Sequence, residues 1–184
     1  FTRDDANADI RIAQSSVPAS AWAYYPDRDA HGGDVWFGNT RGYYDDPARG
    51  SYGWHAFLHE LGHSVGLKHG HDHGVIGAGG ALAVDRDTME WSVMTYRSYV
   101  GDPMENGYSN ENAGFAQSLM RVDIAALQQL YGANYEHQSG DTHYAWDPET
   151  GELRIDGAGQ GAAVANRVFE TIWEGGGEDV IHAS

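Results

Sequence analysis

Residues 59–69 decide the fold: they read HELGHSVGLKH and fit the pattern H-E-x-x-H-x-x-G-x-x-H. On an α-helix His59 and His63 are four residues apart, so both imidazoles project from one face and can bind one metal ion. Gly66 can adopt the positive φ that ends a helix, and this turn would bring His69 to the same ion. Three neutral nitrogen donors suit zinc and leave one coordination position open, which is typical of a catalytic site.

Glu60 follows the first of these histidines directly and is placed to accept a proton from an attacking water molecule. H-E-x-x-H alone occurs by chance in unrelated helices, and the alternative is an ordinary helix that ends in a histidine-rich loop. The glycine and the third histidine at the required offsets favour the metal site. His71 and His73 lie just beyond it in a glycine-flanked stretch. Histidines in such a stretch are more often ordinary loop residues than ligands of a second metal ion.

A second motif lies downstream at residues 92–96, which read SVMTY. A methionine between small and aromatic residues is usually core packing, and Met94 alone would be interpreted that way. The three histidines followed by this methionine turn resemble the metzincin metallopeptidases, and in detail their serralysin branch. The resemblance covers nearly the whole chain and includes residues 6–12, 23–26, 59–69, 94–96 and 123–134.

The resemblance implies an α+β fold. We expect a zincin-like catalytic domain with a twisted mixed β-sheet and an active-site helix in residues 1–136, without its N-terminal part. Residues 137–184 would form a linker and the beginning of an RTX-like, calcium-binding parallel β-roll. The repeat G-G-x-G-x-D-x-U-x does not recur in the closing residues, so the sequence contains only the entry to such a roll.

The resemblance also implies roles for individual residues. Met94 would form the hydrophobic floor beneath the zinc. Tyr96 would be an additional zinc ligand that swings away to hydrogen-bond the tetrahedral intermediate, the alternative being a buried phenol satisfied by backbone. An extended substrate would add to the edge strand formed by Ala21, Trp22, Ala23, Tyr24 and Tyr25, the alternative being an ordinary edge strand.

Comparison with the family further suggests one structural calcium site between two segments near the C-terminus. Its candidate ligands are the carbonyls of Gln138, Gly140, Thr142 and Gly176 and the carboxylates of Glu174 and Asp179. Calcium takes six to eight oxygen ligands, and this set supplies six candidates. Gln138 and Glu174 depart from the arginine and aspartate common in the family, and a solvated acidic turn is the alternative.

Composition restricts the remaining function classes. A formal net charge of -16 disfavours nucleic acid and anionic membranes as partners, because phosphate binding needs clustered Lys and Arg. The chain has no cysteine, which excludes a disulfide framework. A hydrophobic content of 41% is that of a folded domain rather than a disordered chain.

Periodicity and turn residues predict the regular elements. Period-two patterns predict strands over residues 9–14, 21–25 and 34–37, with further β-like pieces at 154–156 and 166–173. Helical patterns predict an active-site helix over 52–65, capped by Ser51 and burying Ala56, Leu58, Leu61 and Val65, and a second helix over 119–131 stopped by Gly132. Residues 74–90 are predicted to form a long surface loop, and Asp123 to have a structural hydrogen-bonding role.

Together these observations predict a zinc-dependent endopeptidase of broad specificity that acts on proteins or peptides. The resemblance implies secretion from a bacterium into the extracellular space and allows for a proteinaceous inhibitor. The alternative is a catalytically inactive zinc- or calcium-dependent binding module, although such a module has no use for Glu60. Phe1-Thr2 resembles the interior of a family strand, so we expect a longer protein at both ends and an N-terminal fragment that associates with this chain.

Overall fold

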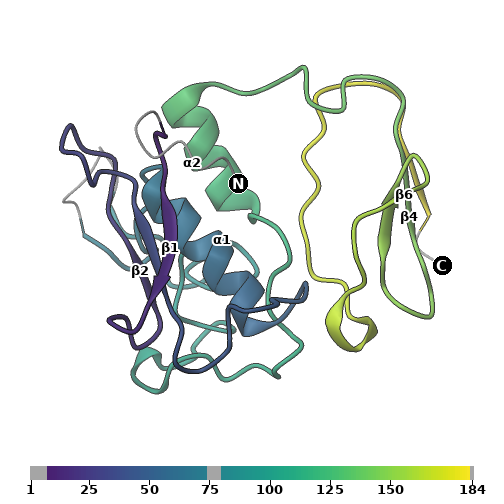
Figure 1. Cartoon of the computed structure of the whole chain (residues 1–184). Helices are drawn as coiled ribbons and strands as arrows, with labels where there is room; N and C mark the ends of the chain where they lie inside the picture. The colour runs from purple at the N-terminus through teal and green to yellow at the C-terminus, as the bar shows by residue number, and fades with distance from the viewer. Residues whose placement is uncertain (1–7, 74–79, 183–184) are drawn as a thin grey trace.

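The computed structural model describes residues 8–73 and 80–182. Figure 1 shows the helices and one sheet on one side of the molecule, with another sheet on the other side. The helices are α1 (Tyr52–Ser64) and α2 (Arg121–Tyr131), with 3₁₀ turns η1 (Met104–Asn106) and η2 (Val164–Asn166). The predicted α+β class is confirmed. The strand expected at Phe1-Thr2 and residues 74–79 of the expected loop lie outside the described residues.

The first sheet has the order β1-β3-β2 and is mixed, as predicted. Its strands are β1 (Ile12–Ser15), β2 (Ala21–Ala23) and β3 (Val35–Gly38). β1 runs parallel to β3, whereas β2 runs antiparallel to it and forms one edge of this sheet. All three strands fall at the predicted places with shorter or shifted bounds. Val35 and Phe37 are fully buried on the face that packs against α1.

Helix α1 begins where the sequence predicts and ends one residue earlier. Ser51 caps it, because its hydroxyl oxygen accepts a hydrogen bond from the backbone N–H of Trp54 at 3.2 Å. Gly66 has φ +98° and turns the chain back beneath the helix. The predicted apolar face is only partly right. Ala56 is buried, but Leu58, Leu61 and Val65 are half-buried, since the buried positions of this helix also hold His55, His59, Glu60 and His63.

The prediction that residues 74–90 form a surface loop is partly wrong. Within its described part, residues 80–90 form neither helix nor strand, but Asp87, Thr88 and Met89 are almost fully buried. Met89 packs with Leu67 and other apolar residues in the core cluster beneath α1 and α2. Glycine-rich composition therefore masked a segment that contributes to the core.

Helix α2 begins at Arg121, two residues later than predicted, because Met120 occupies the N-cap position. Asp123, 2% exposed, fixes this start: its carboxylate accepts hydrogen bonds from Met120 N at 2.9 Å, Val93 N at 2.8 Å and Ser92 Oγ at 2.6 Å. Burial raises the pKa of this carboxyl group, while the three donors oppose the shift. The structural role predicted for Asp123 is confirmed.

We expect Asp123→Ala to lower the free energy of unfolding by about 3 kcal/mol or more, because each buried donor left unpaired costs about 1–3 kcal/mol. Urea denaturation measures this loss. Glu90→Ala is the matched control, since Glu90 is a carboxylate on the surface whose ion pair with Arg121 spans 3.9 Å. Its removal should change stability by less than about 1 kcal/mol. Equal effects of the two substitutions would contradict the structural role.

The second sheet has the order β6-β5-β4-β7. Its strands are β4 (His143–Trp146), β5 (Leu153–Ile155), β6 (Ala158–Gly159) and β7 (Val180–His182). Only β4 and β7 pair in parallel, and the other neighbours are antiparallel. The parallel β-roll and the domain boundary near residue 137 remain predictions.

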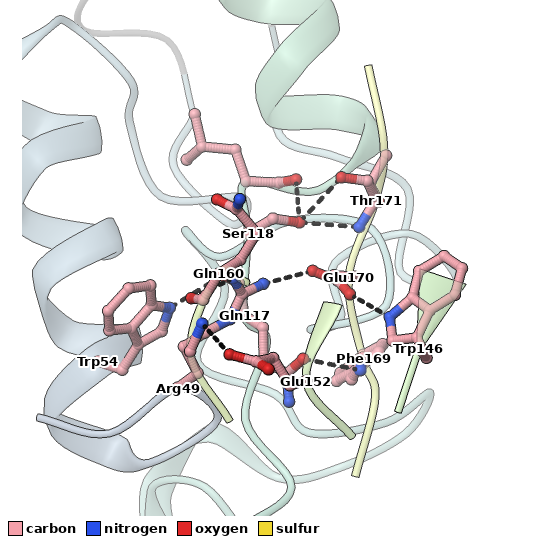
Figure 2. Close-up of polar contacts among 12 residues, drawn as sticks. Arg49, Trp54, Gln117, Ser118, Trp146, Glu152, Gln160, Phe169, Glu170 and Thr171 are labelled. Carbon is pink, nitrogen blue, oxygen red and sulfur yellow. Dashed lines mark hydrogen bonds and ion pairs between the residues drawn. The ribbon is translucent and has the colours of Figure 1, made fainter. Parts of the chain in front are cut away.

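The strand predicted over residues 166–173 is wrong. Residue 166 belongs to η2, and residues 167–173 have no strand partner because loops satisfy their backbone groups. Gln117 N donates to Phe169 O at 2.9 Å, and Ser118 Oγ accepts from Thr171 N at 2.8 Å (Figure 2). Backbone and side-chain groups of residues 117–118 thus take the place of the strand partner that the β-branched pattern suggested.

A buried ion pair attaches this segment to the first part of the chain. Glu170 accepts from the guanidinium of Arg49 at 2.5 Å and from Trp146 Nε1 at 2.8 Å (Figure 2). The side chains of Arg49 and Glu170 are only 14% and 6% exposed. Because Arg49 lies just before α1 and Trp146 ends β4, Glu170 joins the second sheet to the start of α1.

Within the described residues, neither helix has the length and apolar character needed to cross a membrane.

Candidate metal centre

The structure brings His59, His63 and His69 together. One nitrogen from each ring lies within 4.8 Å of the others. Helix α1 places the first two on one face, and the turn at Gly66 returns the third to them. Nε2 of His63 lies 3.0 Å from Nε2 of His69.

Backbone carbonyls fix the tautomers of the two helical histidines. Nδ1 of His59 donates to Val93 O at 2.7 Å, and Nδ1 of His63 donates to Leu67 O at 2.8 Å, because a carbonyl can only accept. In the neutral rings Nε2 therefore carries a lone pair. Asp72 Oδ2 lies 3.3 Å from Nδ1 of His69, which favours the same tautomer there. Lone pairs that face each other at 3.0 Å suit a shared cation, so the three residues fit zinc.

Burial keeps these rings neutral near pH 7. It lowers the pKa of His59 well below its usual value, lowers the pKa of His63, and lowers the pKa of His69 to about 4. For His69 the neighbouring His63 acts in the same direction, while Asp72 opposes it. Neutral imidazole is the form that binds a metal ion.

Glu60 lies beside the histidines and is 8% exposed. Burial raises the pKa of its carboxyl group to about 7. A carboxyl group with a pKa near the working pH can both accept and release a proton, which is the property required of a general base. Glu60 thus lies beside the histidines as expected, and its role as the base stays a prediction.

Met94 and Tyr96 both lie at the histidine cluster. Met94 is 2% exposed and packs beneath α1, where a Cβ added to Gly62 would come within 2.5 Å of its sulfur. The hydroxyl of Tyr96 lies 2.9 Å from Nε2 of His69, and the side chain is 37% exposed. Tyr96 therefore contacts the candidate ligand set and is accessible to a bound molecule, unlike a phenol satisfied by backbone.

The second histidine group gives no separate site. His69, His71 and Asp72 also bring ligand atoms within 4.8 Å of one another, but this set shares His69 with the first cluster. The rings of His69 and His71 stack 5.2 Å apart, and Asp72 accepts from the backbone N–H of His69 at 3.2 Å. We interpret these residues as a support for His69.

A cleft of about 630 Å³ opens at the cluster and is lined by His59, Glu60 and Tyr96. Ser20 and Ala21 at the start of β2 form part of its border, so the predicted edge strand does lie beside the cleft. Of the five predicted residues, Tyr24 and Tyr25 lie beyond the strand, although Tyr24 N still donates to Asp34 O at 2.9 Å.

Several cleft residues were not found from the sequence. His55, Tyr108 and Phe115 line it, together with Arg41 and Asn110. His55 lies four residues before His59, and this spacing could have placed it on the same helix face. Tyr108 and Phe115 carry no local signal, because long-range packing alone brings them to the cleft.

The two segments predicted to bind calcium lie against each other, because β4 pairs with β7. Thr142 N donates to Asp179 Oδ1 at 3.0 Å, and Thr142 Oγ1 donates to Gly140 O at 3.0 Å. Glu174 accepts from the hydroxyl of Tyr144 and from Gly175 N.

Backbone conformation keeps these two segments close. Gly177 has φ +115°, and a Cβ there would come within 2.3 Å of Gly140 O. Gln138 also has a positive φ of 47°, and Gly176 lies in the facing segment. The predicted residues are thus adjacent, with both carboxylates bonded to protein donors.

Comparisons with known proteins show which proteins the chain resembles. No protein-family model matches the chain. The chain is 34% identical over 199 residues to metalloprotease AprA of Pseudomonas entomophila (strain L48), covering all of this chain and 39% of that protein. It is 32% identical over 173 residues to metallopeptidase AprA of Pseudomonas marginalis, covering 90% of this chain and 35% of that protein. It is 29% identical over 188 residues to serralysin B of Dickeya chrysanthemi, covering 100% of this chain and 37% of that protein.

These matches cover most of the chain at about 30% identity and support its assignment to the serralysin-type metalloprotease family. The predicted resemblance is confirmed. The chain spans between a third and two fifths of the length of these relatives.

Proposed function

We propose that the protein is a zinc-dependent endopeptidase that hydrolyses peptide bonds in proteins with broad specificity. The observation that carries this proposal is the convergence of His59, His63 and His69 beside the buried carboxylate of Glu60 at the wall of an open cleft. A binding-only zinc site needs no base at this position, so Glu60 favours the enzyme over an inactive binding module. The named metalloproteases among its relatives give independent support.

In this proposal the three histidines would hold zinc through Nε2. Zinc bound there would polarise the scissile carbonyl and lower the pKa of water from about 15.7 to roughly 7. Glu60 accepts the proton of the attacking water and delivers it to the departing amine. The hydroxyl of Tyr96 donates a hydrogen bond where negative charge develops on the carbonyl oxygen. Met94 supports the histidines from below.

We assign substrate binding to the edge of β2. Ala21–Ala23 pairs with β3 on one side only within the described sheet, so an extended peptide can add on the other side. Main-chain hydrogen bonds carry no side-chain information, which accounts for broad specificity. The proposed substrates are extracellular proteins, in keeping with the proposed secretion of this protein by a bacterium.

Digestion of casein with and without a zinc chelator tests the proposed activity. We expect cleavage that the chelator abolishes and that added zinc restores. Proteolysis that the chelator leaves unchanged would exclude the proposed metal chemistry, and absence of cleavage by the zinc-loaded protein would exclude the enzyme.

For the second sheet we propose one structural calcium ion held by the six predicted groups on the segments 138–142 and 174–179. Its support is that the β4–β7 pairing brings these segments together. Glu174 and Asp179 would exchange their protein donors for the cation, which suits a hard ion that prefers carboxylate and carbonyl oxygens.

We expect calcium at 100 times its Kd to stabilise the protein by about 2.7 kcal/mol. A thermal melt with calcium or with magnesium measures the effect. Asp179→Asn should remove the stabilisation by calcium, whereas Glu149→Gln, on an exposed turn of the same sheet, should keep it. A melting temperature that does not respond to calcium would contradict the site.

A further inference from the structure

We infer that His55 and Tyr108 are positioning residues that hold the peptide group preceding Tyr96. The inference rests on the proposed function, because it concerns the side chain assigned there to the developing negative charge. Neither residue belongs to the metal-ligand set, and both line the cleft.

The first contact reaches the backbone beside Tyr96 directly. The hydroxyl of Tyr108 donates to the carbonyl oxygen of Thr95 at 2.7 Å. This carbonyl belongs to the peptide bond that joins Thr95 to Tyr96, and Thr95 is fully buried. Its orientation therefore helps to set the direction in which the Tyr96 side chain leaves the backbone.

The second contact anchors Tyr108 to helix α1. A phenol has one hydrogen, and Tyr108 gives it to Thr95, so the 3.0 Å contact with His55 requires Nε2 of His55 to be the donor. His55 is 1% exposed, and burial lowers its pKa to about 3, which keeps the ring neutral, while the contact with Tyr108 places its one hydrogen on Nε2. His55 lies one helical turn before His59. The chain of hydrogen bonds from His55 through Tyr108 to Thr95 thus begins on the same helix as two of the candidate metal ligands.

Other contacts hold the side chain of Thr95 and so restrict the residue whose carbonyl Tyr108 binds. Thr95 Oγ1 donates to Asp87 Oδ1 at 2.9 Å and accepts from Arg97 N at 3.1 Å. The hydroxyl of Tyr96 then lies 2.9 Å from Nε2 of His69. Removing the Tyr108 hydroxyl leaves the Thr95 carbonyl unpaired on one side. Small displacements of a reacting group cost up to about 100-fold in rate.

The test is a double-mutant cycle between Tyr108 and Tyr96, measured as kcat and KM for peptide cleavage by the zinc-loaded protein. We expect Tyr96→Phe to lower kcat by about 100-fold, because it removes one donor to the developing charge. Tyr108→Phe should lower kcat by about tenfold with little change in KM or zinc affinity. In the Tyr96→Phe background the same substitution should have almost no effect, since the side chain it positions is already inactive.

Substitutions of His55 give a second test, in which a conservative variant should restore activity. His55→Leu should lower kcat as Tyr108→Phe does, whereas His55→Gln, which keeps an N–H donor, should recover most of it. Tyr44→Phe is the matched control. Tyr44 is a tyrosine of the interior, 5% exposed, whose hydroxyl bonds Ser20 Oγ at 2.8 Å and no group at Tyr96. It should alter stability without altering kcat.

The possible results separate this inference from the proposed function. Equal kcat losses for Tyr108→Phe in both backgrounds, or an unchanged kcat in the single variant, would overturn the positioning role while leaving the peptidase intact. A zinc-loaded wild-type protein that cleaves no peptide would overturn the proposed function, and the positioning role with it.

Discussion

Replacing Glu60 by Gln should lower kcat for peptide cleavage by about 10²- to 10⁴-fold, the usual contribution of a general acid–base group. The amide has nearly the same shape as the carboxylate but cannot accept the proton of the attacking water. KM should change little, because Glu60 is assigned to the reaction and not to substrate binding. Steady-state kinetics on a fluorogenic peptide measures both quantities.

Two further measurements on the same variant identify the cause of the loss. Zinc content should stay at that of the wild type, because Glu60 is not among the three ligands. The melting temperature should not fall, since burial raises the pKa of Glu60 and a neutral side chain removes the cost of burying a charge. Glu90→Gln, at an exposed carboxylate, should leave kcat unchanged. Full activity of Glu60→Gln would contradict the assigned base.

Loss of the metal should abolish activity and also weaken the fold. His63→Ala removes the central histidine of the cluster, and we expect cleavage to fall to background. Zinc present at 1,000 times its Kd stabilises the native state by about 4.1 kcal/mol, and this stabilisation should be absent from the variant. Elemental analysis and thermal melts with added zinc measure the two effects.

His137→Ala provides the control for a histidine outside the cluster. His137 is exposed, so this variant should retain both zinc and activity. In the wild type, zinc and not calcium should restore the activity of chelated protein. Retention of one equivalent of tightly bound zinc by His63→Ala would contradict the proposed ligand set.

The sequence predicts the active-site helix well because the information there is local. The cap at Ser51, the four-residue spacing of His59 and His63, and the positive φ at Gly66 each depend on neighbours within one or two turns. The three strands of the first sheet are also found at their predicted places, since alternation along a strand reports which face is buried. Their exact ends depend on partner strands and are not encoded locally.

The misplaced elements are those decided by distant contacts. The β-branched residues at 166–173 satisfy a strand pattern, but the loop at Gln117 and Ser118 takes their hydrogen bonds. Residues 87–89 follow a glycine-rich stretch and are nevertheless buried. Tyr108 reaches His55 across 53 positions, a contact that no local pattern reports.

The Arg49–Glu170 pair has a consequence for how the molecule comes apart. Detaching the second sheet would leave a guanidinium and a carboxylate without partners. Removing one member of a buried ion pair costs about 3–5 kcal/mol of folding free energy. A cut in the connection between α2 and β4 should therefore leave the two pieces associated, and heating should melt both sheets in a single transition.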